Sequence, residues 1–339
     1  MSAAARAWPV RHLRRHAPGW PDALEHLDLP PPALWLRGPC IPTSPAVAVV
    51  GARDATVGGL EIARRLGADL AAAGIAVVSG MALGIDGAAH RGALEGGGIT
   101  VGVLGCGIDI CYPSGHRALR DRIIATGAVL TEEPPGTPPA PWRFPRRNRL
   151  IAALAAAVVV VEATCRSGAL STARHAADLG REVFAVPGSV LSDRSAGTNS
   201  LIRDGATPLT ETADLAAVPA LAPAIDAARS RFRLVGATLR PRVPPTGAAP
   251  AALHPTTTAL LRCLGHDAVH PDALAAQLRL TPAALAAHLS ELELGGLVRT
   301  VAGGLVVRDA ANRGFPHTAA NRPLQTPPKA AGATRPERG

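Results

Sequence analysis

The stretch AVAVVGARDATVGGLEIARRLGADLAAAGIAVVSG, residues 46–80, predicts the fold, because it places two apolar runs on either side of a helix-like segment. The runs at 46–50 and 75–79 are typical of strands that are buried on both faces of a sheet. Between them, Gly58–Ala73 is predicted to be helical because its apolar side chains recur every three or four residues, and Gly74 ends it. Two buried strands joined by a helix form the repeating unit of a parallel sheet.

The same alternation of strand and helix continues along the chain to about residue 188. Further predicted strands are ITVGVLGCG (99–107), AVLTE (128–132), VVVVEA (158–163) and REVFAVPG (181–188). We therefore predict an α/β fold with a doubly wound parallel sheet that is covered by helices on both faces. Sheets of this kind bind ligands at the carboxyl ends of their strands, so a site is expected there.

Changes in composition divide the chain into five predicted segments. Residues 1–45 are rich in proline and arginine and are interpreted as an N-terminal cap that packs on the α/β domain of 46–215. Residues 216–254 have the Ala- and Pro-rich composition of a linker. Three helix-like segments and a hairpin in 255–309 predict a winged helix, and 310–339 has the composition of a disordered tail.

The formal charge of +9 over 339 residues indicates an anionic partner. However, Lys329 is the only lysine, and arginine, alanine, glycine and proline are all abundant, as a GC-rich genome would make them. Part of the positive charge can therefore reflect codon usage, and the placement of the arginines matters more than their number.

Several classes of protein are disfavoured by what the chain lacks. Its five cysteines form no CxxC pair, and it has no signal peptide or membrane-length apolar run, so we predict a cytoplasmic protein with reduced thiols and no metal site. The turn GARDATVGG after the first strand does not fit GxGxxG, and no GxxxxGK[ST] motif occurs. We therefore expect no cofactor.

A cluster of arginines precedes an apolar run in FPRRNRLIAALA, residues 144–155. Because its proline suits the first turn of a helix, Arg146, Arg147 and Arg149 are predicted to surround the N-terminus of that helix. Guanidinium groups match phosphate oxygens, and Phe144 offers a ring on which a base can stack. Phe144 is also compatible with a hydrophobic staple that packs against the helix.

Glycines and polar residues follow the ends of the predicted strands. They are Gly51 and Arg53, Ser79 and Gly80, Ser167 and Gly168, and Thr198 and Asn199. Glycine lets backbone N–H groups approach a ligand closely, and helix N-termini favour phosphate. Together with the arginine cluster, these turns predict an anion-binding site at one edge of the sheet.

Carboxylates near the strand ends admit structural and catalytic interpretations. Asp86 is predicted to cap its helix and can pair with His90 on the same face, and Glu162 is predicted to hold a loop by accepting backbone N–H bonds. No Ser-His-Asp or Cys-His set can be assembled with any specificity.

The predicted winged helix has an unusual recognition helix. This helix, Pro282 to Leu294, contains no arginine or lysine but carries Glu291 and Glu293. A helix that reads duplex DNA needs donors for phosphates and base edges, so contact with a protein is favoured over duplex binding.

Seven motifs of the chain resemble the DNA-processing protein A family, also called DprA or Smf. They are WPDALEHLDLPPPALWLRG (20–38), VAVVGARDAT (47–56), VVSGMALGIDGAAHRGAL (77–94), GVLGCGIDICYPSGH (102–116), FPRRNRLIAALA (144–155), VVVVEATCRSGALSTARHAADLGREVFAVPG (158–188) and GTNSLIRDGA (197–206). The likeness covers roughly residues 20–210 in the family's order, and a C-terminal winged helix is a common partner in that family.

The resemblance implies an extended Rossmann-like domain in a homodimer that binds single-stranded DNA. Such proteins serve natural transformation, protect the incoming strand and help to load RecA for homologous recombination, and they are not known for catalysis. Carried onto this sequence, the nucleic-acid site comprises Gly51, Arg53, Ser79, Gly80, Phe144, Arg146, Arg147, Asn148, Arg149, Ser167, Gly168, Thr198 and Asn199. The segment from Tyr112 to Arg117 is expected to border the pocket.

The chain departs from the family pattern at a few positions. Leu83 stands where the family usually has an arginine, and Ala52 where serine is commoner, so the chain is expected to lack one hydroxyl and either one positive contact or one structural ion pair. Many members carry an N-terminal helical domain before the WPDALEHL segment, for which this chain has almost no room. We expect that either this start is internal or that module is absent.

Two alternative functions remain open. One is an enzyme similar to the LOG-type phosphoribohydrolases, which have PGGxGTxxE near the sixth strand. The corresponding PGSVLSDRSAGTNSLI (187–202) lacks the closely spaced glycines and the acid after GT, which disfavours this function. The other is a winged-helix regulator with the α/β domain as a sensor, which the acidic recognition helix disfavours.

Overall fold

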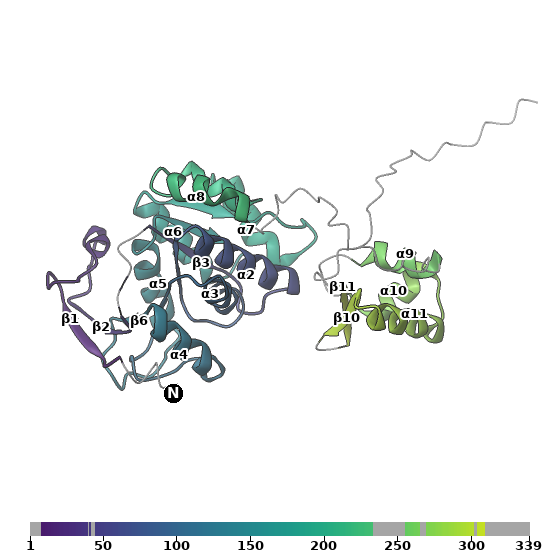
Figure 1. Ribbon diagram of the computed structural model, residues 1–339, viewed down its shortest axis with the longest axis horizontal. Coiled ribbons are helices and arrows are strands. Elements are labelled where there is room, and N and C mark those ends of the chain that lie inside the picture. Colours follow the sequence, from purple (N-terminus) through teal and green to yellow (C-terminus); the bar gives the residue numbers. More distant parts are fainter. Residues whose placement is uncertain are drawn as a thin grey trace, which may run out of the picture.

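The computed structural model describes residues 8–39, 41, 45–232, 255–264, 269–301 and 304–308. The N-terminal part of these residues forms a nine-stranded sheet in the order β1-β2-β6-β5-β4-β3-β7-β8-β9 (Figure 1). The strands are β1 (Arg11–Arg14), β2 (Ala33–Arg37), β3 (Ala46–Val50), β4 (Ala76–Ser79), β5 (Thr100–Val103), β6 (Ala128–Thr131), β7 (Ala157–Val160), β8 (Glu182–Ala185) and β9 (Thr207–Pro208).

The order of the strands reverses at the centre of the sheet. From β3 the chain adds β4, β5 and β6 on one side, and it then returns to add β7, β8 and β9 on the other. Every neighbouring pair from β6 to β9 is parallel. This arrangement confirms the predicted doubly wound α/β sheet, and it brings the carboxyl ends of these strands to one edge.

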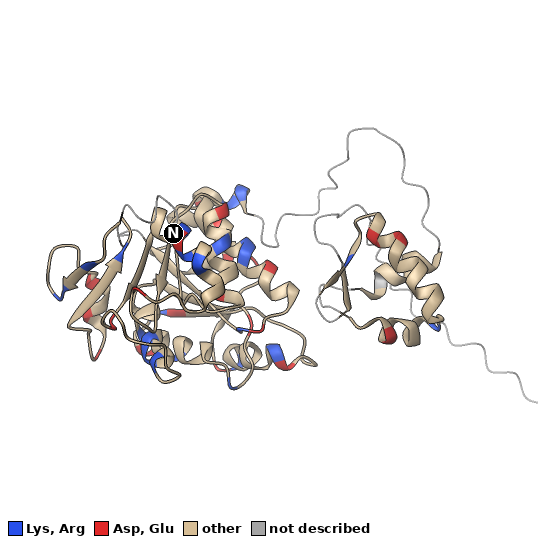
Figure 2. Ribbon diagram, turned by 90° about the horizontal axis from the view of Figure 1, so that it is seen from below, with Lys and Arg blue, Asp and Glu red and all other residues tan. Residues whose placement is uncertain are grey.

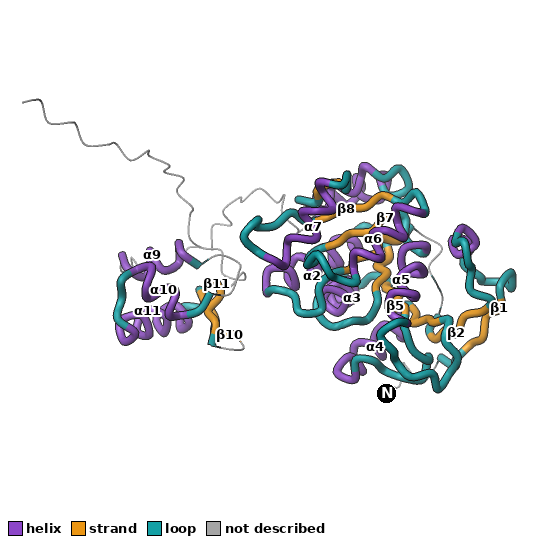
Figure 3. Tube along the Cα trace, turned by 180° about the vertical axis from the view of Figure 1, so that it is seen from behind, coloured by secondary structure: helices purple, strands orange, loops and turns teal. Residues whose placement is uncertain are grey.

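Helices cover both faces of the sheet (Figure 3). They are α2 (Val57–Ala72), α3 (Ile85–Glu95), α4 (Arg117–Thr126), α5 (Arg143–Ala153), α6 (Ala169–Asp178), α7 (Asp193–Arg203) and α8 (Ala222–Ala228). Successive residues of β3 point to opposite faces, so Val50 joins the apolar cluster of Ile151 in α5, whereas Val49 joins that of Leu66 in α2. Burial on both faces explains why the strands are almost purely apolar.

Two predicted segment boundaries differ from the structure. The N-terminal segment is more than a cap, because β1 and β2 extend the sheet and Trp35 of β2 pairs with Thr131 of β6 in antiparallel fashion. The predicted linker also begins too early, since α8 follows residue 216, and both Leu221 just before α8 and Ile225 within it are buried in the core. An Ala-rich composition misled this prediction, because alanine forms helices as readily as it occurs in linkers. Residues 233–254 and 310–339 lie outside the described residues.

The C-terminal part forms the predicted winged helix. It contains α9 (Pro255–Cys263), α10 (Pro271–Leu278), α11 (Pro282–Leu294) and the antiparallel strands β10 (Val298–Val301) and β11 (Leu305–Arg308). Buried leucines from all three helices share a core with Val298 and Val306 of the hairpin. No helix in the described part of the chain is long and apolar enough to cross a bilayer.

His90 of α3 is buried and bonded to β5. Its Nδ1 lies 2.6 Å from the hydroxyl of Thr100, and that hydroxyl donates to the carbonyl of Val77. Nδ1 therefore donates its proton to Thr100. The predicted pair with Asp86 is wrong, because the Asp86 carboxylate instead accepts bonds from the backbone of the preceding turn.

The burial of His90 predicts a loss of stability in acid. Burial, and then the charges of His116, Arg91 and Arg147, lower the pKa of His90 from 6.5 to about 3. In the unfolded chain the imidazole of His90 takes up a proton below about pH 6.5, whereas in the folded protein it stays neutral down to about pH 3. The contribution of neutral His90 to the unfolding free energy is therefore fully present above about pH 6.5 and is lost as the pH falls towards 3. We expect the unfolding free energy to fall by about 1.4 kcal/mol per pH unit in this interval, relative to His90→Gln. Urea denaturation of both proteins at about pH 7.5 and about pH 5 measures this difference, and a difference that is independent of pH would contradict it.

Candidate functional site

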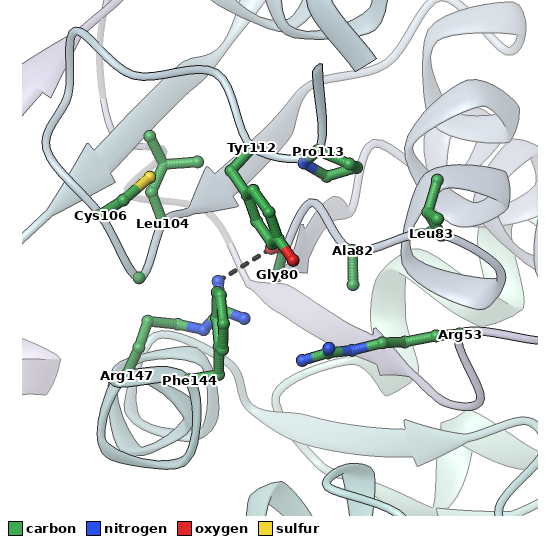
Figure 4. A pocket seen from close by; sticks show the side chains of 11 residues that line it. Arg53, Gly80, Ala82, Leu83, Leu104, Cys106, Tyr112, Pro113, Phe144 and Arg147 are labelled. Atoms are coloured by element: carbon green, nitrogen blue, oxygen red, sulfur yellow. Dashed lines mark hydrogen bonds between the residues drawn. The ribbon is translucent and has the colours of Figure 1, made fainter. Parts of the chain in front are cut away.

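A pocket lies at the carboxyl ends of β3, β4 and β5, where α5 crosses the edge of the sheet (Figure 4). Its lining residues are Arg53, Gly80, Ala82, Leu83, Leu104, Gly105, Cys106, Tyr112, Pro113, Phe144 and Arg147. Four of the predicted site residues, Arg53, Gly80, Phe144 and Arg147, thus meet in one place.

Phe144 lies at the centre of an aromatic and cationic stack. The Tyr112 ring stacks on it with a centroid distance of 5.5 Å, and the Arg53 guanidinium lies 5.0 Å from the ring centroid. Gly105 permits this approach, because a Cβ there would lie 2.9 Å from Cδ1 of Phe144. The hydrophobic staple is wrong, because α5 begins at Arg143 and Phe144 therefore lies inside the helix rather than before its cap.

Arg53 is the exposed cation of the pocket. Among the described residues it has neither an ion pair nor a hydrogen-bonded partner, and its contact is with the face of Phe144. Stacking on the ring leaves the N–H groups at the edge of the guanidinium able to bind an anion. Arg53 thus combines a cation for a phosphate with an aromatic surface for a base.

Arg147 points into the protein instead of towards the helix N-terminus. It is only 5% exposed, and its Nη1 donates to the carbonyl of Gly80 at 2.8 Å and to the carbonyl of Val103. Burial lowers the pKa of Arg147 to about 10, although the Asp86 carboxylate opposes this shift. The prediction that three arginines surround the helix N-terminus is therefore wrong for Arg147. Its guanidinium instead donates to backbone carbonyls just after β4 and at the end of β5, which need a hydrogen-bond donor where they are buried.

Arg146 and Arg149 meet carboxylates of the same chain. Nη2 of Arg149 lies 2.5 Å from Oε2 of Glu132, and Nη2 of Arg146 lies 3.3 Å from the same oxygen. Arg146 also lies 3.6 Å from Glu133, and half of its side chain is exposed. Figure 2 shows that the described part of the chain carries both basic and acidic residues along its ribbon. The sequence signal that was missed is the acidic pair directly after β6.

Asp86 and Gly80 hold the turn after β4 in place. Oδ2 of Asp86 accepts bonds from the backbone N–H groups of Gly80 at 3.1 Å and Ala82 at 3.3 Å. Burial raises the pKa of Asp86, and the charge of Arg147 opposes that rise. The same turn is also held from α4's side, because the carbonyl of Met81, which follows Gly80, accepts a bond from Nδ1 of His116 at 3.0 Å. Asp86 therefore fixes the preceding turn rather than capping its own helix.

Glu162 holds the turn after β3, as predicted. Its Oε2 accepts the backbone N–H of Thr56 at 2.9 Å, and its Oε1 accepts the hydroxyl of the same residue. The Thr56 oxygen in turn accepts the N–H of Gly59 at 2.9 Å and caps α2. Gly51, next to this turn, is a packing residue, since a Cβ there would lie 2.7 Å from Cγ1 of Ile85.

Several polar residues of the predicted site are committed to internal contacts. Ser79 and Thr198 are fully buried and donate to the carbonyls of Val49 at 2.6 Å and Ser195 at 3.1 Å. Their hydroxyls therefore satisfy buried carbonyls. The prediction that Ser79 and Thr198 contact a ligand directly is wrong for this conformation, because both side chains are buried. A sequence pattern cannot distinguish a hydroxyl that binds a ligand from one that binds the backbone.

The remaining predicted residues surround the second half of the edge. Asn148 donates to the carbonyl of Gly168 at 3.1 Å, which joins the middle of α5 to the start of α6. Ser167 accepts the N–H of Ala169 at 3.3 Å, and the side chain of Asn199 bonds to both backbone groups of Gly188. Arg117 is exposed at the start of α4 and is absent from the pocket lining, whereas Tyr112 of the same predicted border segment lines it.

Comparisons with known proteins match two parts of the chain to family models. A family model described as DNA recombination-mediator protein A matches residues 11–218, and one described as DprA winged helix domain matches residues 244–304. A putative DNA processing protein DprA of Mycobacterium tuberculosis is 45% identical over 271 residues, which cover 79% of this chain and 66% of that protein. The match thus spans just under two thirds of the length of that relative.

Two solved structures are similar in fold. The X-ray structure of DNA processing protein A from Streptococcus pneumoniae has a TM-score of 0.59 and 37% identity, and the match covers 63% of this chain and 75% of that one. A structure of DNA processing protein A from Helicobacter pylori, which concerns its single-stranded DNA binding mode, has a TM-score of 0.55 and 27% identity. The second match covers 67% of this chain and 97% of that one.

The close packing around Gly80 predicts that a side chain at this position lowers the stability of the fold. In Gly80→Ala, the new methyl group would lie 2.5 Å from Nη2 of Arg147 and 2.7 Å from Oδ2 of Asp86. We expect the unfolding free energy to fall by about 1–3 kcal/mol, as for other overpacked sites. Chemical denaturation measures this change.

Gly168→Ala is the matched control for that substitution. Its φ of −61° suits alanine, and no heavy atom lies within 4 Å of an added Cβ. We expect a change below about 0.5 kcal/mol. Equal unfolding free energies for the two variants would show that the contact between Gly80 and Arg147 is unimportant.

Proposed function

The chain belongs to the DNA recombination-mediator protein A family, and we propose that it binds single-stranded DNA at the pocket of Arg53, Tyr112 and Phe144. The solved structure from Helicobacter pylori, whose subject is single-strand binding, supports the binding of single strands by this chain, and its match covers 67% of the chain. The observation that carries it is the placement of the Arg53 guanidinium over the Phe144 ring, at 5.0 Å from its centroid.

The chemistry of this stack suits a single strand better than a duplex. An arginine without a carboxylate partner can neutralise a phosphate, and an adjacent ring can stack on a base that is free of pairing. In a duplex, both faces of each base are already stacked on neighbouring pairs. The pocket therefore requires an unpaired strand to use both halves of the site.

The predicted site residues have different roles in this proposal. Arg53 and Phe144 contact the strand, and Arg146, which is half exposed, exchanges its partner Glu133 for a phosphate. Arg147 acts by holding Gly80 in place, and Arg149 stays paired with Glu132. Asn148, Ser167, Gly168 and Asn199 shape the adjoining edge.

We further propose that the chain is a binding protein rather than an enzyme. The pocket lining contains no carboxylate and no histidine within the described residues, so the commonest general acids and bases do not line the pocket beside a bound nucleotide. This absence, like the missing acid after Gly197-Thr198, argues against the phosphoribohydrolase alternative. The family relationship supports a cytoplasmic homodimer that protects single strands, loads RecA onto them and serves natural transformation.

The winged helix has a separate role in this proposal. The exposed end of α11 carries Glu291 and Glu293, and Thr300 of the hairpin donates to Glu293. Acidic groups at this position repel phosphates, so we propose that this domain contacts a protein.

The central test is binding of the wild-type chain to labelled single-stranded and duplex oligonucleotides. We expect single strands to bind more tightly, with an affinity that falls as salt is added. Fluorescence anisotropy over a range of salt concentrations measures both properties. Equal affinity for the two forms at every salt concentration would exclude the pocket as a single-strand site.

Two variants separate the phosphate contact from the base contact. Arg53→Ala should weaken binding by about 1–3 kcal/mol and reduce the slope of log affinity against log salt by about 0.7. Phe144→Ala should weaken binding by about 1–3 kcal/mol without changing that slope. Arg203→Ala, an exposed arginine in the last turn of α7, is the control and should bind like the wild type. If Arg203→Ala lost as much DNA affinity as Arg53→Ala, the loss would reflect the overall charge of the protein and not a contact at Arg53.

The proposed partnership with RecA predicts an effect on filament formation. On single strands coated with single-strand-binding protein, we expect the wild-type chain to shorten the lag before RecA hydrolyses ATP. Arg53→Ala should lose this effect in proportion to its loss of DNA affinity. A lag that is unchanged by the wild-type chain would contradict the loading role while leaving single-strand binding intact.

A further inference from the structure

Two neighbouring aliphatic side chains are displayed at the turn between β8 and α7. Val190 is 90% exposed and Leu191 is 94% exposed. The turn itself is held by hydrogen bonds, because Asn199 bonds to both backbone groups of Gly188 and the hydroxyl of Ser189 accepts the N–H of Leu191 at 3.2 Å. The protein therefore presents two apolar groups to solvent on a fixed turn.

Exposed apolar side chains concentrate at one edge of the sheet. Of the nine large ones in the part that the structure describes, five follow the carboxyl ends of parallel strands. They are Leu83 after β4, Tyr112 after β5, Trp142 after β6, and Val190 and Leu191 after β8. Isolated exposed apolar residues are ordinary, whereas a row of them along one edge marks an interaction surface.

The turn after β8 is joined to the turn that carries Arg53. Nη2 of Arg194 at the start of α7 lies 2.6 Å from Oδ2 of Asp54, the residue after Arg53. Between the two turns lies the end of β7, where Arg166 is exposed. A ligand that is bound at Arg53 and extends along this edge towards Val190 therefore passes the exposed side chain of Arg166.

We propose that Val190 and Leu191 form a second contact for the nucleobases of the strand that is held at Arg53 and Phe144. This inference rests on the proposed function of the pocket. Aliphatic side chains have no donor for a phosphate, but they pack against base faces and the thymine methyl group and can insert between base steps. The same strand is the favoured occupant because it alone matches both the cations and the apolar groups of this edge.

The sheet sets the length of strand that fills the pocket and also reaches the second contact. The steps from β5, at the far side of the pocket, to β8 pass through β4, β3 and β7, and these four steps of about 4.8 Å span about 19 Å, of which the first two steps cross the pocket itself. At the stacked rise of about 3.4 Å per nucleotide, this distance corresponds to about six nucleotides, and to fewer in an extended strand. A short strand that fills the pocket therefore does not reach the second contact, whereas a longer strand does.

The test compares thymidine oligonucleotides of about three and about twelve nucleotides, lengths that lie on either side of this span. In the double variant Val190→Ser, Leu191→Ser, we expect the twelve-nucleotide strand to bind about fivefold to tenfold more weakly, with an unchanged salt slope because no charge is removed. Binding of the three-nucleotide strand, measured by competition, should be unchanged. The two side chains are almost wholly exposed, so the variant is expected to fold like the wild type.

Leu294→Ser is the matched control, since Leu294 is 91% exposed at the end of α11 in the winged helix and is absent from the α/β part that holds the pocket. It should bind both strands like the wild type. Unchanged affinity of the double variant for the longer strand would overturn the inference, as would an equal loss for both strands. A change in sedimentation without a change in DNA affinity would assign the turn to a second copy of the chain and would also overturn it. Failure of the wild type to bind either strand would instead overturn the proposed function.

Discussion

The buried guanidinium of Arg147 joins the three elements that form the pocket. Arg147 belongs to α5, and its guanidinium donates to the carbonyl of Gly80 just after β4 and to that of Val103 at the end of β5. Moving α5 away would leave a buried cation without partners, which is among the most unfavourable changes in a protein interior. Phe144 lies one turn earlier on the same helix, so its ring is held at a constant place relative to the strand ends. The contact of that ring with Arg53 and Tyr112 follows from this anchoring.

Local neutralisation decides which arginines are available to a ligand. Glu132 and Glu133 pair with Arg146 and Arg149, whereas Arg53 has no carboxylate partner within the described residues. A net positive charge alone therefore says little about the position of an anion site, because a guanidinium that is already paired must break that contact before it can bind a phosphate. The segment FPRRN contains both kinds of arginine, because Arg147 is buried and bonded to backbone carbonyls, whereas its neighbour Arg146 is half exposed.

Much of the fold follows from short-range patterns. The buried strands were predictable because runs such as AVAVV have no polar residue to place on a solvent face, and the helix after β3 was predicted to within one residue at each end. Predictions failed where a contact distant in sequence decides the structure. The pairing of β2 with β6 places the N-terminal segment in the sheet, and the burial of Ile225 turns part of an apparent linker into core.

The sequence alone determined the strand and helix order and placed Arg53 and Gly80 after strand ends and Phe144 beside an arginine cluster, because these depend on periodicity, turn chemistry and residue type. Only the tertiary structure decided the role of each polar group. It committed the hydroxyls of Ser79 and Thr198 to internal carbonyls and turned Arg147 inwards to Gly80 and Val103. The physical reason is that a buried polar group must find a partner, and parallel strands supply that partner from residues that lie far away in the chain.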